Sequence, residues 1–176
     1  SLFDQTESAV LNLDDPYGQR LSREIPPQPQ LNYSTARDEA DLVGKNVMLQ
    51  ADGVQFEMVG KGFIHRVRFP MPGDYSAHNA LAAAGAALLL GIAPETVAQA
   101  LCQSAGVRGR CEVLYSGKFT IICDYAHTGD GIEKVLSGLR PFVRGKLVVL
   151  FGCAGERDAR KREPMAKAAL RYGDEI

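Results

Sequence analysis

The hydrophobic pattern of the N-terminal part predicts a short strand followed by a helix. In residues 8–18, SAVLNLDDPYG, an apolar run ends in the polar side chains Asn12, Asp14 and Asp15, as expected where a strand leaves a core. Residues 16–25, PYGQRLSREI, have the spacing of a helix. A linker rich in proline and glutamine, PPQPQ, follows.

Alternating apolar and polar residues over Val47–Phe69 predict two or three antiparallel strands. Asp-Gly and Gly-Lys-Gly supply turn signals in this stretch, which we interpret as a β-rich insert. Two helices are expected next, over about Ser76–Leu90 and Pro94–Gln103. Gly91 would end the first, and Pro94 suits the first position of the second because its φ is already helical.

After Gly106 the pattern changes to strand, strand, helix, strand, helix. Two apolar runs without alternation, FTIIC and KLVVLFGC, flank the helical pattern GIEKVLSGLRPF, and ERDARKREPMAKAALRYG follows as a second helix. Apolar strands joined by a helix are typical of a parallel sheet covered on both faces. The sequence therefore predicts an α/β fold in two domains, residues 1–106 and 107–176, with the boundary near Gly106–Arg110.

Composition narrows the possible partners. The chain has 176 residues, 45% of them hydrophobic, and its 20 basic and 21 acidic side chains leave a net charge of −1. No overall field would attract such a chain to nucleic acid or to a membrane surface, so we expect neither as a partner. The apolar stretch ALAAAGAALLLG is too short to cross a bilayer and is expected to form a buried helix.

The cysteines and histidines indicate neither a disulfide framework nor a metal knuckle. The four cysteines lack C-x-x-C spacing, and the three histidines stand far apart. A reducing cytosol is the expected compartment, and Cys153 is expected to fill space rather than act as a nucleophile. His65 and His78 are interpreted as structural. Because the chain begins SLF and stops where an apolar strand is about to start, we expect a fragment of a longer protein.

Polar residues follow two of the predicted strands, in DYAHTGD and GCAGERD. In parallel sheets, ligands collect outside the carboxyl ends of the strands, so both segments are expected to face a cleft. Asp124 could accept two hydrogen bonds from a ribose diol, or it could cap the helix that begins near Thr128 or Asp130. From spacing alone these two interpretations are equally good.

A basic run stands at the start of the last predicted helix: Arg157, Arg160, Lys161 and Arg162. A helix dipole disfavours cations there, and a nearby anion would offset that cost. A solvated basic face is the simpler explanation.

Four segments together resemble a known family: GDYSAHNALAA, GRCEVL, DYAHTGDGIEKVL and FGCAGERDARKREPM. In this order they are similar to the Mur ligases, and most to the branch that adds the third residue of the peptidoglycan stem peptide. The resemblance runs from residues 12–15 to the end of the chain. It implies the second half of a central ATPase domain followed by the first half of a Rossmann-like C-terminal domain.

The resemblance also implies roles for individual residues. Asn79 matches the asparagine that binds adenine, Arg110 the arginine at the domain junction that contacts the nucleotide, and Asp124 the ribose-binding aspartate with His127 beside the base. Arg157 matches the arginine that binds the carboxylate of the incoming amino acid. The implied substrates are ATP, a UDP-MurNAc-dipeptide and an amino acid, diaminopimelate or lysine, joined through an acyl phosphate by a cytoplasmic monomer.

Departures and missing motifs limit what the chain could do alone. The sequence differs from many relatives at four positions: Ser76 replaces asparagine, Gly129 proline, Ala154 glycine and Glu156 aspartate. It has no G-x-x-G-K-[ST] phosphate loop, and the ligands of Mg²⁺ are expected outside this chain. We therefore identify no catalytic residue and expect no activity from the chain alone. The alternatives are a folylpolyglutamate synthetase or another ligase of the superfamily, and a non-catalytic nucleotide-binding module.

Overall fold

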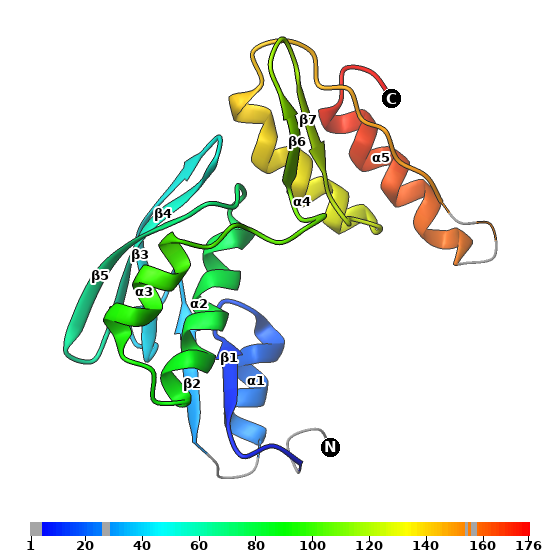
Figure 1. Cartoon of the computed structure of the whole chain (residues 1–176). Coiled ribbons are helices and arrows are strands. Elements are labelled where there is room, and N and C mark those ends of the chain that lie inside the picture. Colours follow the sequence, from blue (N-terminus) through cyan, green and yellow to red (C-terminus); the bar gives the residue numbers. More distant parts are fainter. Residues whose placement is uncertain (1–4, 26–28, 154, 156–157) are drawn as a thin grey trace. The chain divides into compact units, whose positions relative to one another are not determined.

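The computed structural model describes residues 5–25, 29–153, 155 and 158–176. These residues form two compact units (Figure 1). Unit 1 is built from most of residues 1–105, and unit 2 from residues 106–176 together with the short segments 50–52 and 71–73.

Unit 1 contains one five-stranded sheet with the strand order β1-β2-β3-β4-β5. Its strands are β1 (Ala9–Asn12), β2 (Gln30–Ser34), β3 (Leu42–Gln50), β4 (Gly53–Gly60) and β5 (Phe63–Phe69). The pairs β1–β2 and β2–β3 are parallel, whereas β4 and β5 are antiparallel. The carboxyl ends of β1 and β2 therefore lie at the same edge of the sheet.

The strands expected over Val47–Phe69 are present, but they continue the parallel strands instead of forming a separate insert. β3 begins at Leu42, and Leu42 and Val43 pair in parallel register with Tyr33 and Ser34 of β2. β2 itself was not predicted. Its polar residues and the preceding proline-rich linker obscure the hydrophobic pattern of a strand. Its position is set by pairing with β1 and β3, and the local sequence does not specify those partners.

Three helices pack against this sheet: α1 (Pro16–Glu24), α2 (Tyr75–Leu89) and α3 (Pro94–Cys102). Asp15 caps α1 by accepting hydrogen bonds from the backbone N–H groups of Tyr17 and Gly18. A side chain at Gly18 would collide with the backbone carbonyl oxygen of Asn12, so glycine allows α1 to lie directly against the end of β1.

α2 supplies much of the apolar core of unit 1. Ala77, Ala80, Leu81 and Ala84 lie on its inner face and are fully buried. The small volume of the three alanines lets the helix approach the sheet closely. None of the helices in the described part of the chain combines the length and hydropathy that a membrane crossing requires.

Unit 2 contains an antiparallel hairpin and two packed helices. Its elements are β6 (Glu112–Ser116), β7 (Thr120–Cys123), α4 (Gly129–Leu139) and α5 (Arg162–Tyr172), with 3-10 turns at Arg140–Phe142 and Ala159–Lys161. The core joins α4 to α5 through Ile132, Leu136, Met165 and Ala168. Cys153 is half-buried and packs against this core, as its expected space-filling role requires.

The expected parallel pairing of FTIIC with KLVVLFGC is wrong for the described residues. β7 pairs only with β6, and residues 146–153 form no named strand. They make one parallel bridge, Val148 to Glu175, supported by a hydrogen bond from Val149 N to Glu175 O of 2.8 Å. Leu147, Val149 and Phe151 pack on the helices, while Val148 and Leu150 are 62% and 98% exposed. An uninterrupted apolar run therefore does not show that a segment is buried on both of its faces.

The last helix is shorter than its pattern suggested. α5 begins at Arg162, and the preceding 3-10 turn is capped by Asp158, whose carboxylate accepts a hydrogen bond from Arg160 N. Pro164 lies in the first turn of α5, where a missing N–H costs no helical hydrogen bond.

Candidate nucleotide site

The end of β7 places Asp124 at the centre of a small polar cluster in unit 2. One carboxylate oxygen accepts a hydrogen bond from Cys111 N at 2.8 Å, and the other accepts one from Ala126 N at 2.7 Å. These bonds tie the start of β6 to the loop after β7. Each oxygen keeps a second lone pair for another donor, so the carboxylate remains able to bind a diol.

Asp124 does not cap α4, which corrects one of the two interpretations above. The N-cap is Thr128, whose hydroxyl oxygen accepts a hydrogen bond from Gly131 N at 3.1 Å. Threonine suffices for this task because it satisfies one of the free N–H groups of the first turn. The cap thus leaves Asp124 available for binding.

Arg110 and His127 lie beside Asp124 through their contacts with Tyr125. The guanidinium carbon of Arg110 is 4.8 Å from the centre of the Tyr125 ring. The rings of Tyr125 and His127 meet edge to face with centroids 5.2 Å apart, and His127 Nδ1 is 3.0 Å from the Tyr125 carbonyl oxygen. All three side chains are exposed. The loop therefore offers aromatic rings that can stack on a planar base and a guanidinium that can bind an anion.

The segment before β6 has an unusual backbone that orients Arg110. Gly109 has a φ of 70° and Cys111 a φ of 44°, both in the left-handed region. Gly109 N donates a hydrogen bond of 2.7 Å to the Glu112 carboxylate, and the bond from Cys111 N to Asp124 fixes the other side. Because Cys111 is not glycine, its conformation is held by these contacts.

A pocket of about 190 Å³ borders Asp124 within unit 2. Its walls are largely apolar and come from β7, α4 and residues 147–151, including Ile122, Leu136 and Val149. The polar cluster thus lies at the rim of an apolar hollow.

Asn79 and Arg157 are the remaining two predicted residues. Asn79 is exposed on the first turns of α2 in unit 1. Arg157, with Ala154 and Glu156, lies outside the described residues. The structure therefore brings together Arg110, Asp124 and His127, and the roles of all five residues remain predictions.

Part of the basic run serves the structure of unit 2. Arg162 donates a hydrogen bond of 3.1 Å to the Gly155 carbonyl oxygen, which holds the loop before α5 against the helix. Arg160 is exposed. Both observations agree with the simpler explanation of this run.

Sequence reasoning missed a second polar cluster, at the carboxyl ends of β1 and β2 in unit 1. The Asp14 carboxylate accepts hydrogen bonds from the Ser34 hydroxyl, from Thr35 N at 2.7 Å and from the Thr35 hydroxyl at 3.1 Å. His78 Nδ1 lies 3.7 Å from Asp14, and its Nε2 lies 3.4 Å from the Thr35 hydroxyl. The available signal was the position of Asp14 directly after a strand.

These contacts favour the ionised form of Asp14. Burial opposes ionisation, but the hydrogen bonds from Ser34 and Thr35 and the electrostatic interaction with His78 outweigh it, so the pKa of Asp14 lies below its ordinary value of 3.8. Burial and the negative charges of Asp14 and Asp15 raise the pKa of the neighbouring Tyr33.

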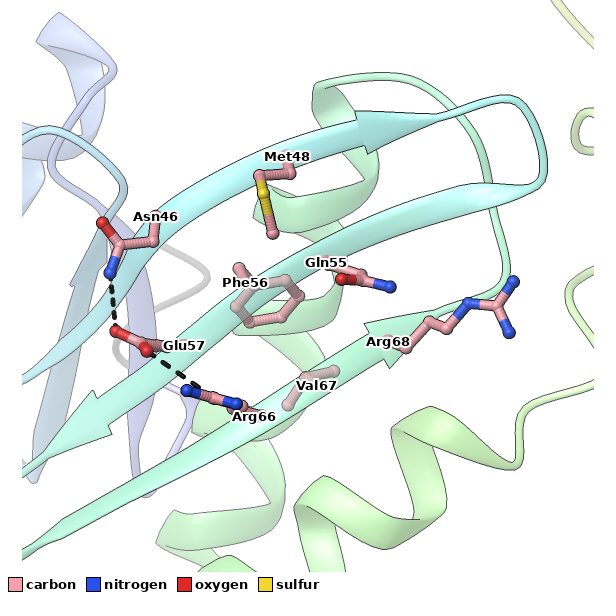
Figure 2. A pocket seen from close by; sticks show the side chains of 8 residues that line it. All are labelled: Asn46, Met48, Gln55, Phe56, Glu57, Arg66, Val67 and Arg68. Carbon is pink, nitrogen blue, oxygen red and sulfur yellow. Dashed lines mark hydrogen bonds and ion pairs between the residues drawn. The ribbon is translucent and has the colours of Figure 1, made fainter.

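An open groove of about 450 Å³ crosses the outer face of β3, β4 and β5 (Figure 2). Glu57 lines it, accepts a hydrogen bond of 2.7 Å from Asn46 and lies 3.9 Å from Arg66. Gln55 and Arg68 form the next cross-strand pair along the groove. Among the described residues that line this groove, none was expected to bind nucleotide.

The described residues contain no group of three histidine, cysteine, aspartate or glutamate side chains arranged to hold a metal ion. They therefore do not fit Mg²⁺ by themselves. The expectation that its ligands lie outside this chain is not tested by this observation.

Comparisons with known proteins agree with the two-unit arrangement of motifs. A family model of the Mur ligase middle domain matches residues 1–87, and a model of the Mur ligase glutamate ligase domain matches residues 109–176. UDP-N-acetylmuramoyl-L-alanyl-D-glutamate--2,6-diaminopimelate ligase 1 of Clostridium acetobutylicum is 35% identical over 98% of this chain and 36% of its own length.

Two solved structures resemble the chain. A UDP-N-acetylmuramoyl-L-alanyl-D-glutamate--2,6-diaminopimelate ligase superposes with a TM-score of 0.69 at 31% identity, over 98% of this chain and 37% of that one. MurF from Acinetobacter baumannii superposes with a TM-score of 0.79 at 19% identity, over 94% and 36%, which indicates a shared fold alone. The chain spans a little over a third of the length of these proteins.

Proposed function

Because the chain belongs to the Mur ligase family, we propose that the protein containing it is an ATP-dependent, ADP-forming ligase of peptidoglycan synthesis. In this proposal it adds the third residue of the stem peptide to UDP-MurNAc-L-Ala-D-Glu. We assign residues 1–106 to the family's central domain and residues 107–176 to its C-terminal domain. The chain alone is expected to be inactive, and the complete protein to be a cytoplasmic monomer.

The observation that carries this proposal is the environment of Asp124. Its carboxylate is fixed by two backbone N–H groups and keeps lone pairs for a ribose diol, with Arg110, Tyr125 and His127 exposed beside it. In the proposed complex Asp124 binds the ribose, His127 lies beside the base, Arg110 contacts the nucleotide and Asn79 binds adenine. Tyr125 orients both Arg110 and His127.

The chemistry proposed for the whole protein has two steps. A carboxylate oxygen of the dipeptide attacks the γ-phosphorus of ATP, and ADP leaves, which gives an acyl phosphate. The amine of the incoming amino acid then attacks the acyl carbon, phosphate leaves, and the nitrogen loses a proton. Positioning and charge neutralisation supply most of the catalysis in such transfers, with Mg²⁺ ligands expected elsewhere in the protein.

We propose 2,6-diaminopimelate as the incoming amino acid. Support comes from the relative in Clostridium acetobutylicum, whose name specifies that substrate and which is 35% identical over 98% of this chain. Arg157 would bind a carboxylate of the amino acid through two parallel hydrogen bonds, a geometry that a guanidinium provides.

Two alternatives remain for the test to decide. A folylpolyglutamate synthetase or another ligase of the superfamily would share the nucleotide cluster but accept a different carboxylate. A non-catalytic nucleotide-binding module would bind ATP through the same cluster without releasing phosphate.

The test uses the full-length protein that contains this chain. It is incubated with ATP, Mg²⁺, UDP-MurNAc-L-Ala-D-Glu and diaminopimelate, and both the tripeptide product and phosphate are measured. Parallel reactions contain lysine in place of diaminopimelate, or a folate and glutamate. The proposal predicts one phosphate per tripeptide formed with diaminopimelate. Ligation only with the folate, or nucleotide binding without phosphate release, would establish one of the alternatives.

A further inference from the structure

His78 connects the first turn of α2 to the loops that follow β1 and β2. Its Nε2 lies 3.4 Å from the Thr35 hydroxyl oxygen, and its Nδ1 lies 3.7 Å from an Asp14 carboxylate oxygen. With its proton on Nε2, the ring donates to Thr35, and the Thr35 hydroxyl donates to Asp14 at 3.1 Å. The imidazole thus connects the helix to both loops.

The loops that hold His78 are themselves fixed. Ser34 donates its hydroxyl proton to Asp14, and its oxygen accepts hydrogen bonds from Ala36 N at 3.0 Å and Arg37 N at 2.7 Å. Asp14 in turn accepts from Thr35 N. A side chain anchored here is held against a backbone that has little freedom to move.

The next residue in α2 is Asn79, which is proposed to bind adenine. Asn79 is exposed, whereas Ser76, Ala77 and Ala80 are fully buried on the inner face of the helix. His78 lies between these two faces and is half-buried. Successive helical side chains are separated by about 100° around the axis, so the contacts of His78 set the direction in which Asn79 points.

We propose that His78 is a positioning residue for nucleotide binding. By donating to Thr35, whose hydroxyl donates in turn to Asp14, it fixes the rotation of the first turn of α2, and it thereby orients the Asn79 amide toward adenine. This inference rests on the proposed function, in which Asn79 binds the base. His78 touches no substrate in this account, and its effect passes entirely through its neighbour.

The second ring nitrogen of His78, Nδ1, is consistent with a ring held in one orientation. His78 Nδ1 is inaccessible to water and has no hydrogen-bond partner among the described residues. A buried polar atom without a partner is unfavourable, so the contact between Nε2 and Thr35 must hold the ring against that cost. A side chain that only filled space would not need a polar ring here.

The test measures ATP binding to the full-length protein by calorimetry, without the other substrates. His78→Phe keeps an aromatic ring but removes both polar contacts, and we expect it to weaken ATP binding about tenfold, as the loss of one oriented hydrogen bond would. His78→Gln can place an amide N–H near the position of Nε2, and it should stay within about threefold of wild type.

His65→Phe is the matched control, because His65 lies on β5 in the same unit and stacks on Phe63 with ring centroids 5.7 Å apart. It should leave ATP affinity unchanged. In the ligase assay, His78→Phe should raise the KM for ATP about tenfold and leave the KM for the amino acid within about twofold, a split that a general loss of stability would not produce.

Asn79→Ala separates the failure of this inference from the failure of the proposed function. If Asn79→Ala weakens ATP binding but His78→Phe lowers only the melting temperature, His78 is structural and the inference is overturned, while the nucleotide site stands. If Asn79→Ala leaves ATP affinity unchanged, both the adenine contact and the positioning role are wrong. Equal losses of affinity in His78→Phe and His78→Gln would also contradict the role of the Thr35 contact.

Discussion

At the scale of single residues, the two polar clusters use their carboxylates differently. Asp14 is enclosed by Ser34 and Thr35, which satisfy it from within the same unit. Among the described residues, Asp124 accepts hydrogen bonds from two backbone N–H groups, and its neighbours Tyr125 and His127 are exposed. Asp14 is therefore expected to act on stability and Asp124 on ligand binding.

The first prediction concerns the pH dependence of stability at Asp14. Its pKa is lowered in the folded protein, so its stabilising contribution is fully present above the ordinary value of 3.8 and is lost as the pH falls through the lower folded pKa. We expect Asp14→Asn to be less stable than wild type at pH 6, with a difference that shrinks below about pH 4.

Urea unfolding between pH 3 and pH 7 provides the measurement. Asp38→Asn is the control, since Asp38 is an exposed carboxylate of the same unit, 3.1 Å from Lys45. If the difference between wild type and Asp14→Asn were constant over the whole pH range, the charge of Asp14 would contribute nothing to folding.

The second prediction concerns Arg157, which follows from the resemblance alone because it lies outside the described residues. A guanidinium can bind a carboxylate through two parallel hydrogen bonds, and lysine cannot. In the full-length enzyme, Arg157→Lys should raise the KM for the amino acid by about tenfold or more and change the KM for ATP far less.

Arg160→Lys is the matched control for this substitution, because Arg160 is an exposed arginine of the same run. Steady-state kinetics with each substrate varied in turn give the two constants. Unchanged amino-acid kinetics combined with a lower melting temperature would make Arg157 a structural residue.

At the scale of the elements, helices were the easier part to predict. α1, α2 and α3 begin and end within about one residue of the expected positions, because caps, prolines and apolar spacing are local signals. β2 and the course of residues 146–153 were not predicted, because strand pairing depends on distant segments. Gly129, which replaces the proline of many relatives, could be explained only from the structure, where α4 packs closely on α5.

The third prediction tests this packing. A Cβ atom at Gly129 would lie 2.6 Å from Pro164 Cβ and 3.0 Å from its carbonyl carbon, so α4 and α5 approach too closely for any side chain here. Gly129→Ala should lower the free energy of unfolding by about 1–3 kcal/mol, the usual cost of overpacking.

Gly145→Ala is the control, since a Cβ there would meet no atom within 4 Å and should change stability by less than about 0.5 kcal/mol. Urea unfolding followed by circular dichroism compares the two variants. Equal stabilities of Gly129→Ala and wild type would mean that α5 can move away from α4 without cost.

At the scale of the whole molecule, motif order was more informative than strand pattern. The α/β class was predicted from the pattern of strands and helices and the family from four short segments, and both are confirmed by the matches to residues 1–87 and 109–176. Asn79, Arg110, Asp124 and His127 were expected to line one site, which stays a prediction, although Arg110 and His127 both contact Tyr125 in the loop after β7. Tyr125 and the Asp14 cluster were missed. The contacts of Tyr125 and of Asp14 join residues that come together only in the folded chain, and no local sequence pattern indicates them.

The central claim is that Asn79, Arg110, Asp124 and His127 bind one nucleotide. The most direct measurement is a crystal structure of the full-length protein with a non-hydrolysable ATP analogue. The account predicts the Asn79 amide within hydrogen-bond distance of adenine and the Asp124 carboxylate within hydrogen-bond distance of the ribose hydroxyls. A nucleotide bound away from these side chains, with Asp124 contacting only the N–H groups of Cys111 and Ala126, would contradict it.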